Sequence, residues 1–141
     1  MEKERPKVGT GVMIKRGNEV LLGLRKNSMG AGEWTFPGGH LENFESIEDC
    51  VKREALEECG VKIKNVKFQC VANIRKYQKH YLMIGFVSDL KSGDPKLLEP
   101  DKFEKWQWFN LNKLPKNLFG GTSYILKSYK DKKIYFDGKG I

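Results

Sequence analysis

The stretch that decides the fold runs from Cys50 to Gly60 and reads CVKREALEECG. On a helix that turns by about 100° per residue, its apolar side chains form one stripe, and Glu54 and Glu58 fall on that same stripe. Glu57 lies roughly a quarter-turn away. A surface helix normally keeps its carboxylates opposite the apolar face. These acids therefore need a reason to face the interior at one end of the helix.

The cost of burying charge limits the explanations for these acids. An unpaired carboxylate that leaves water costs several kcal/mol, so it normally neutralises or finds a cation. Two acids one helical turn apart also repel each other, and a third acid nearby makes this worse. A solvated helix end, or lysines of a neighbouring element, would explain one such acid. Mg²⁺ takes hard oxygen ligands in an octahedral array, and the clustered carboxylates predict a magnesium site.

A glycine-rich turn precedes the acidic segment and reads FPGGHLE, from Phe36 to Glu42. Gly38 and Gly39 lack side chains, so backbone groups can approach a ligand closely there. A glycine carbonyl from this turn could complete the coordination shell of a metal ion. An acidic helix, a backbone turn and a basic surround together suit Mg²⁺-assisted phosphoryl chemistry.

The charge of the chain is distributed unequally. All 141 residues together carry a net charge of +8. The segment from Gly39 to Val61 holds seven acids and two bases, a net charge of −5, so the remainder carries +13. An acidic cluster in a basic protein suits a site that holds a divalent cation and attracts a phosphorylated ligand. Solvated surface lysines would produce the same charge count.

Other classes of protein find less support in the sequence. A basic chain is compatible with nucleic-acid binding, but no helix-turn-helix, RNP-like or Cys/His signature is present, and we expect no stable nucleic-acid partner. No apolar run approaches the roughly 18 residues of a membrane span, and MEKERPK lacks the apolar centre of a signal peptide. We therefore expect a cytoplasmic protein without a membrane partner. Cys50, Cys59 and Cys70 show no CxxC pairing and are predicted to be buried free thiols.

The chain length suits one compact domain over residues 1–141, because no repeat or Pro/Ser-rich linker divides it. The patterns predict strands at residues 8–15, 18–26, 34–36, 61–74, 79–90 and 106–110. A first helix is expected to begin at the N-cap Ser46 and to stop at Gly60. A second helix is expected within 114–131, after the Gly120–Gly121 break. This order predicts an α/β fold in which two helices flank a mixed sheet.

The acidic segment also resembles the signature of a known family. From Gly39 the sequence reads GHLENFESIEDCVKREALEECGV. It is similar to the Nudix signature, which is Gly, five residues, Glu, seven residues, and then Arg-Glu-aliphatic-any-Glu-Glu-any-Gly-aliphatic. The residues in register are Gly39, Glu45, Arg53, Glu54, Glu57, Glu58, Gly60 and Val61. Ala55 is smaller than the usual aliphatic residue, which affects packing. The resemblance implies the Nudix α/β/α sandwich.

Two further segments, residues 21–42 and 98–115, look like the MutT-type nucleoside triphosphate diphosphatases, in particular those that act on oxidised and thiopurine nucleotides. This resemblance implies Mg²⁺-dependent hydrolysis of a nucleoside triphosphate, including oxidised or modified dNTPs, to a nucleoside monophosphate and pyrophosphate. Mn²⁺ is a substitute that the same ligands accept. Related diphosphatases are often dimers, so the resemblance allows a homodimer.

The signature carries the diphosphate chemistry and leaves the leaving group open. Nudix proteins also cleave ADP-ribose, nucleotide sugars, dinucleoside polyphosphates, pterin triphosphates and prenyl diphosphates. A third alternative is a nucleotide-sensing or RNA-binding module that keeps the fold and has lost turnover. Degenerate family members usually lose one of the metal-binding acids, and here all of them are present.

The resemblance implies that Glu54, Glu57 and Glu58 bind the metal and take part in catalysis, together with the backbone carbonyl of Gly39. The shared helical face of Glu54 and Glu58 supports this independently. Glu45 precedes the helix, where a carboxylate favours the N-terminal dipole, and a structural role is preferred there over a metal contact.

Two catalytic assignments remain open at this stage. The family reading has Arg53 orienting a catalytic carboxylate, although a surface salt bridge would explain the residue as well. Family members often draw a further acid from the loop that follows the long antiparallel strands, where Glu99 and Glu104 both lie. Glu104 is preferred as the catalytic acid because it shortly precedes the WQWF strand. Either acid can instead be solvated.

The candidates for substrate binding lie around the glycine turn and the segment LFGG. Phe119 is expected to stack on a nucleobase, with Gly120 or Gly121 offering its backbone, unless Phe119 belongs to the core. His40 follows Gly38 and Gly39 and is expected to reach the phosphates or sugar, or else to pack partially. Phe36 lines the other side of the base or packs inward. Arg25 and Lys26 either steer the triphosphate or form a solvated strand end.

Overall fold

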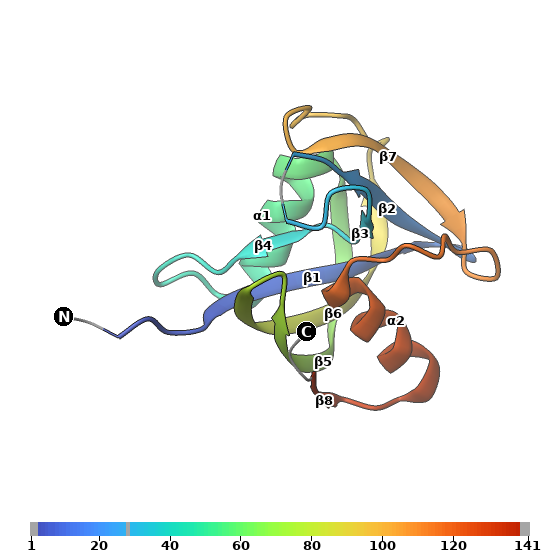
Figure 1. Cartoon of the computed structure of the whole chain (residues 1–141). Helices are drawn as coiled ribbons and strands as arrows, with labels where there is room; N and C mark the ends of the chain where they lie inside the picture. Colours follow the sequence, from blue (N-terminus) through green and yellow to red (C-terminus); the bar gives the residue numbers. More distant parts are fainter. Residues whose placement is uncertain (1–2, 28, 139–141) are drawn as a thin grey trace.

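The computed structural model describes residues 3–27 and 29–138, and over these residues an eight-stranded mixed sheet lies between two helices (Figure 1). The strands are β1 (Lys7–Arg16), β2 (Glu19–Arg25), β3 (Trp34–Thr35), β4 (Gly38–His40), β5 (Lys62–Lys76), β6 (Lys79–Ser92), β7 (Phe103–Asn110) and β8 (Tyr135–Asp137). The helices are α1 (Ile47–Cys59) and α2 (Gly120–Asp131).

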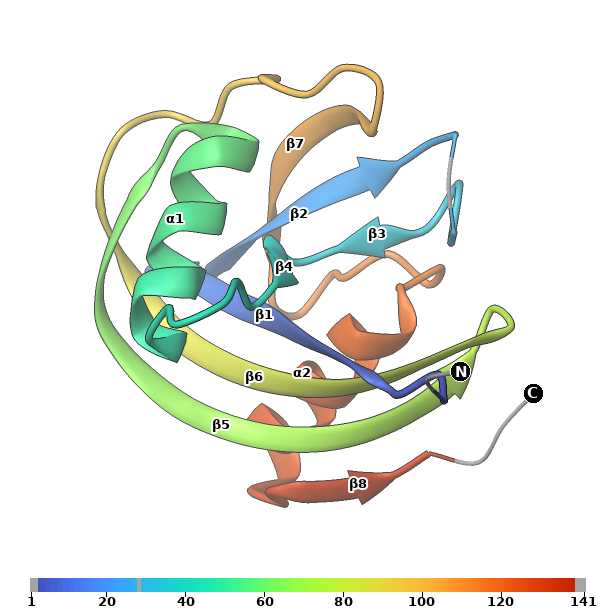
Figure 2. The same ribbon diagram turned by 90° about the vertical axis from the view of Figure 1, so that its left-hand side faces the viewer.

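The strand order places β1 at the centre of the sheet. The main path runs β3-β2-β1-β6-β5-β8, while β4 pairs with β1 and β7 pairs with β2. Strand β1 is parallel to β6, from the pair Lys7 and Tyr81 to the pair Lys15 and Asp89. Strands β5 and β6 form a long antiparallel hairpin that curves beneath the rest of the sheet in Figure 2. The site residues of β1 and β4 therefore lie on the most enclosed strands.

The side chains of β1 connect the two faces of the sheet. Val12 and Ile14 are fully buried in a cluster that includes Val51 of α1. Met13 points the other way and is buried in a second cluster with Ile125 of α2. Successive side chains of a strand alternate between faces, so the two helices cover opposite faces of one sheet. The predicted α/β/α sandwich with two flanking helices is confirmed.

Both ends of α1 carry the predicted caps. The Ser46 side chain accepts a hydrogen bond of 3.1 Å from the backbone N–H of Asp49. Gly60 adopts a left-handed conformation, with φ of 72°, and its N–H donates to the carbonyl of Leu56. A residue without a Cβ adopts this conformation with little strain, so the helix stops there.

The structure differs from the predicted elements in four places. Gly38 and Gly39 belong to a short strand, β4, because they pair with β1, a tertiary contact that glycine-rich sequence does not signal. Strand β7 begins at Phe103, earlier than predicted, and α2 includes the glycine pair at its start. Strand β8 was not predicted, since only Phe136 of its three residues is buried.

Other structural observations concern the cysteines and the membrane. The three cysteines are buried free thiols, as predicted, and burial raises the pKa of Cys59 to about 12. In the described part of the chain, neither helix combines the length and the apolar character that a membrane span requires.

The close approach of β4 to β1 generates the first prediction. A methyl group on Gly38 would overlap the carbonyl oxygen of Thr10 and would lie 2.9 Å from the Cα of Gly11. Because this neighbour is backbone of the central strand, it cannot move aside. We expect Gly38→Ala to lower the thermal midpoint by roughly 5 °C or more, measured by circular dichroism.

The matched control is Gly9→Ala in β1. An added Cβ there would meet only ordinary contacts, the nearest being a Tyr81 side-chain atom at 3.5 Å. Its midpoint should stay within about 2 °C of wild type. Equal losses in both variants would contradict the account of Gly38.

Candidate active site

A cavity of about 670 Å³ lies beside the glycine-rich segments of β1 and β4. One part of its lining is acidic and comes from α1 and from the loop before β7. Another part is aromatic and apolar and comes from the β5–β6 hairpin, β6 and the start of α2. The acidic part is lined by Glu54, Glu57, Glu58 and Glu99; the aromatic and apolar part includes Phe36, Ile74, Tyr77, Met83 and Phe119.

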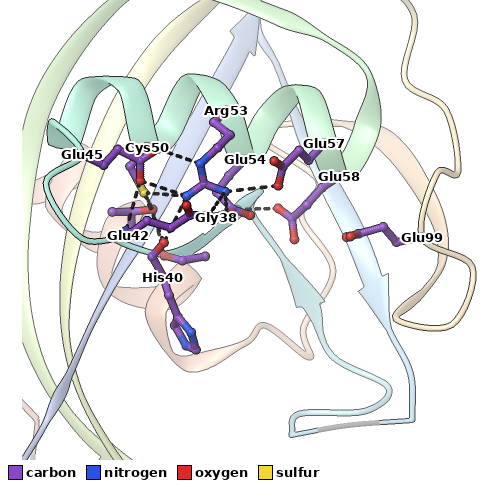
Figure 3. Close-up of polar contacts among 12 residues, drawn as sticks. Gly38, His40, Glu42, Glu45, Cys50, Arg53, Glu54, Glu57, Glu58 and Glu99 are labelled. Carbon is purple, nitrogen blue, oxygen red and sulfur yellow. Dashed lines mark hydrogen bonds and ion pairs between the residues drawn. The ribbon is translucent and has the colours of Figure 1, made fainter.

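Glu58 is the most deeply buried acid of the site, with 8% of its surface exposed. Its Oε1 accepts a hydrogen bond of 2.8 Å from the backbone N–H of Gly38 (Figure 3). Burial raises the pKa of Glu58 well above its usual range, and the charges of Glu54 and Glu99 raise it further. The Gly38 bond and the charge of Arg25 act in the opposite direction. A carboxylate in this position has a strong need for a cation.

Glu54 lies one helical turn before Glu58 and packs against β4. A Cβ on Gly39 would come within 2.5 Å of the Glu54 carboxylate, so only glycine lets the helix approach the strand this closely. Burial raises the pKa of Glu54. The carbonyl oxygen of Gly39 accepts a hydrogen bond of 3.1 Å from the Thr10 hydroxyl and retains a second lone pair.

Arg53 lies at the centre of the acidic network shown in Figure 3. Its guanidinium binds both carboxylate oxygens of Glu45, at 2.6 and 3.0 Å. It also donates to Glu54 at 2.6 Å, to Glu57 at 3.2 Å and to the carbonyl of His40 at 3.2 Å. The bonds from Arg53 lower the pKa of Glu45 to about 2. This bidentate anchor restricts the guanidinium to an orientation from which it can orient Glu54.

The two acids considered for the loop before β7 are placed very differently. Glu99 lines the cavity, and in Figure 3 its carboxylate lies across from Glu58. Its Oε1 is buried without a hydrogen-bond partner, while Oε2 lies 3.6 Å from the Lys102 ammonium. Glu104 is exposed on β7 and is not among the cavity-lining residues. Because the side chain of Phe103 is buried, strand alternation turns its neighbour Glu104 outward. The structure therefore brings Glu99, and not Glu104, to the acids of α1.

The donor set fits a hard divalent cation. Within residues 3–27 and 29–138, no three His, Cys, Asp or Glu groups are arranged as a ready-made metal cage, and Arg53 binds two of the acids. The oxygen donors around this part of the cavity are those of Glu54, Glu57, Glu58, Glu99 and the carbonyl of Gly39. Carboxylates and carbonyls are the ligands that Mg²⁺ and Mn²⁺ prefer. The unpartnered Oε1 of Glu99 indicates the same need for a cation.

The residues expected to bind substrate all line the cavity: Arg25, Phe36, Gly38, His40, Phe119 and Gly121. The His40 ring is committed to Tyr81, whose hydroxyl lies 3.1 Å from Nε2 and whose ring stacks on it. Burial lowers the pKa of His40, and Lys7 and Lys102 lower it further. His40 therefore favours the neutral state. Phe36 is buried and donates its backbone N–H to the Thr122 hydroxyl at 2.8 Å.

Phe119 has neighbours on both faces of its ring. The Tyr77 ring stacks nearly parallel to it, with centroids 5.1 Å apart and an interplanar angle of 6°. The Arg25 guanidinium lies 4.1 Å from the Phe119 centroid. At these distances the two groups would overlap if they shared one face, so they cover opposite faces. The predicted stacking of a base on Phe119 therefore requires one of them to move.

Sequence reasoning missed several cavity residues outside the signature. Tyr77 lies in the turn of the β5–β6 hairpin, and Tyr81 and Met83 lie on β6. The sequence signals the hairpin, but it does not signal that its turn folds over the start of α2. Lys102 lies in the polar loop that the sequence treats as solvated.

Comparison with known proteins gives this arrangement a family. The NUDIX domain profile matches residues 5–129, and the chain belongs to the Nudix hydrolase family. Nudix hydrolases generally use divalent metal ions and act on small-molecule nucleotide substrates.

Individual relatives agree with this assignment. An oxidized purine nucleoside triphosphate hydrolase of Danio rerio is 35% identical over 115 residues, which are 77% of this chain and 69% of that protein. The crystal structure of a MutT NUDIX hydrolase from Burkholderia pseudomallei superposes with a TM-score of 0.84 at 34% identity, over 89% of this chain and 98% of that one. The NAD-capped RNA hydrolase NudC of Pseudomonas putida (strain GB-1) is 35% identical over 107 residues, 74% of this chain but only 36% of that protein.

The buried acids generate a prediction on pH dependence. The raised pKa values of Glu54 and Glu58 give a contribution to stability that is fully present below the unfolded value near 4.5 and is lost as the pH rises through the folded values. The metal-free protein should therefore lose stability as the pH rises above 4.5. The lowered pKa of Glu45 acts below this window. Thermal unfolding in a chelator across this range measures the slope.

Glu58→Gln keeps the shape of the side chain and removes its charge. It should flatten the slope, and at neutral pH its metal-free midpoint should equal or exceed that of wild type, since repulsion from Glu54 is relieved. Glu57→Gln is the matched control because the Glu57 side chain is 54% exposed, and it should follow wild type more closely. A Glu58→Gln protein that unfolds more easily than wild type throughout would show that Glu58 is a structural partner instead.

Proposed function

We propose that the chain is a Mg²⁺-dependent pyrophosphohydrolase that converts a nucleoside triphosphate, including oxidised or modified dNTPs, to a nucleoside monophosphate and pyrophosphate. The observation that carries this proposal is the pair of carboxylates, Glu58 and Glu99, which meet at the acidic part of a cavity whose other part is aromatic. The printed activity of the Danio rerio relative supports the substrate class. We also propose that residues 1–141 act as one Nudix domain.

The acids that would hold the metal are Glu54, Glu57, Glu58 and Glu99, with the carbonyl of Gly39. When bound, Mg²⁺ supplies positive charge at the phosphates and eases deprotonation of water. Arg53 holds Glu54 in a fixed orientation, and the N–H of Gly38 does the same for Glu58. These contacts provide the preorganisation that electrostatic catalysis requires.

Glu99 is our candidate for the general base. Its Oε1 is unpartnered and can accept the proton of the attacking water. The water oxygen attacks a phosphorus of the triphosphate as the bridging P–O bond breaks, and the bond's electrons leave with pyrophosphate or the nucleotide. Arg25, Lys76 and Lys102 line the same cavity and would attract and orient the phosphates. We place Arg53 as a positioning residue because its partners are carboxylates of the site itself.

The base would occupy the apolar part of the cavity. Ile74 and Met83 form part of its lining, and Gly121 presents backbone there without a side chain. The hydroxyls of Thr35 and Thr122 are bonded to each other and to the backbone of Phe36, which leaves backbone groups and ring faces as the main recognition elements. Stacking and shape would then contribute most of the affinity for the base.

A second candidate function is hydrolysis of the diphosphate linkage in an NAD-type RNA cap. The NudC relative bears that activity in its name. The charge of +13 outside Gly39–Val61 would favour an RNA body beyond the cavity. The diphosphate chemistry would be the same, so only the substrate separates the two candidates.

The direct test incubates the purified chain and Mg²⁺ with normal, oxidised and thiopurine nucleoside triphosphates, NAD-capped RNA and ADP-ribose. We expect the highest kcat/KM on a triphosphate, with pyrophosphate and the monophosphate appearing in equal amounts by chromatography. Absence of both products from every triphosphate would refute the proposal. Turnover confined to capped RNA would favour the second candidate.

Glu99 and Glu104 form a matched pair for testing the base. Glu99→Gln should lower kcat on the order of 10²-fold, as loss of a key group in a preorganised site does, while Glu104→Gln should keep wild-type kcat. Circular dichroism checks that both variants fold. If Glu104→Gln loses as much activity as Glu99→Gln, the assignment of the catalytic acid to Glu99 is wrong.

A further inference from the structure

The hydroxyl of Tyr77 joins three segments of the chain that are distant in sequence. Tyr77 lies in the turn between β5 and β6, and its hydroxyl donates a hydrogen bond of 2.7 Å to Oε1 of Glu33, in the segment before β3. The same oxygen accepts a hydrogen bond of 3.0 Å from the backbone N–H of Gly120, the first residue of α2. All of these contacts lie at the aromatic part of the cavity, which Tyr77 itself lines.

The bond to Gly120 replaces a missing helix cap. The N-cap residue of α2 is Phe119, which has no side-chain oxygen and makes no capping bond. Gly120 is buried, and a buried N–H at a helix start normally finds a partner. The phenol of Tyr77 provides that partner from another element. Burial and the bond to Glu33 raise the pKa of Tyr77 to about 12, so the hydroxyl keeps its proton and its donor role.

The backbone of the hairpin turn is strained where it presents this side chain. Tyr77 and Gln78 have φ of 59° and 57°, a pair of left-handed residues that two-residue hairpins usually reserve for Asn and Gly. A bulky residue adopts this conformation only where its surroundings hold it. The two bonds of the hydroxyl and the stacking on Phe119 are the contacts that hold Tyr77 here.

The ring of Tyr77 also completes a layered wall. Phe119 lies between the Tyr77 ring and the Arg25 guanidinium, and Arg25 is itself fixed by a bond of 2.7 Å to the carbonyl of Met29. The three side chains belong to β5–β6, the start of α2 and β2, so no single element sets the position of the wall. The Tyr77 hydroxyl is the polar group that ties two of these elements together.

We propose that Tyr77 is the positioning residue for the base subsite. Its hydroxyl fixes the Arg25–Phe119–Tyr77 wall and the start of α2, against which a planar base lies. Tyr77 thereby controls affinity for the base and leaves the chemistry at the phosphates unchanged. This inference rests on the proposed function, namely that the substrate is a nucleoside triphosphate.

The test compares a ligand that has a base with one that lacks it. Tyr77→Phe keeps the ring and removes the hydroxyl. Binding of an α,β-methylene nucleoside triphosphate and of inorganic tripolyphosphate is measured by calorimetry in the presence of Mg²⁺. Loss of the hydroxyl should raise the Kd of the nucleotide about fivefold or more, while that of tripolyphosphate stays within about twofold. In turnover, KM should rise and kcat should change little.

The matched control is Tyr135→Phe, because Tyr135 is exposed on β8 and does not line the cavity. It should bind both ligands as wild type does. Glu33→Ala is the second variant, since it removes a partner of the Tyr77 hydroxyl from a different segment and should weaken nucleotide binding selectively. It decides the question if Tyr77→Phe does not fold.

The possible outcomes separate the two proposals. If the wild-type protein binds the analogue no better than tripolyphosphate, the proposed nucleotide function fails, and with it the base subsite. If the wild-type protein prefers the analogue but Tyr77→Phe weakens both ligands equally, or neither, the role of Tyr77 is overturned. A selective loss for the nucleotide, absent in Tyr135→Phe, supports the inference.

Discussion

The bond between the Gly38 N–H and the Glu58 carboxylate is the constraint on which the site depends. It joins α1 to β4 and holds an acid at a position where only 8% of the residue is exposed. A charge in such a place costs several kcal/mol unless a cation or donors compensate it. Both glycines of β4 are needed for this approach, because a Cβ on Gly38 would overlap β1 and one on Gly39 would overlap Glu54.

Around this bond the charges are arranged in an order that suits phosphate chemistry. Arg53 uses Glu45 as an anchor and Glu54 and Glu57 as partners, so a single cation partially offsets the repulsion within α1. The orphaned oxygen of Glu99 leaves that compensation incomplete, which is the electrostatic argument for a divalent ion. The aromatic wall lies in a separate part of the same cavity, so affinity for a base and reactivity at phosphate can be controlled by different residues.

The sequence anticipated the parts of the site that lie on one element. Glu54 and Glu58 could be assigned to one face because helical periodicity is a local property, and Ser46 and Gly60 cap α1 for local reasons. The choice between Glu99 and Glu104 could not be made this way. It depends on Phe103, whose burial against the cavity sets the alternation of β7 and turns Glu104 outward.

By itself, then, the sequence determined the acidic helix, the glycine turn before it, the two-layered covering of a mixed sheet and the family to which these belong. Only the tertiary structure decided that Arg25 and Tyr77 cover both faces of Phe119, that Tyr77 caps α2, and that Glu99 faces Glu58. The physical reason is the range of the interactions. Periodicity, caps and turn residues act over a few neighbours in the chain, whereas a stacked ring or an opposed carboxylate depends on which distant strands the buried core brings together.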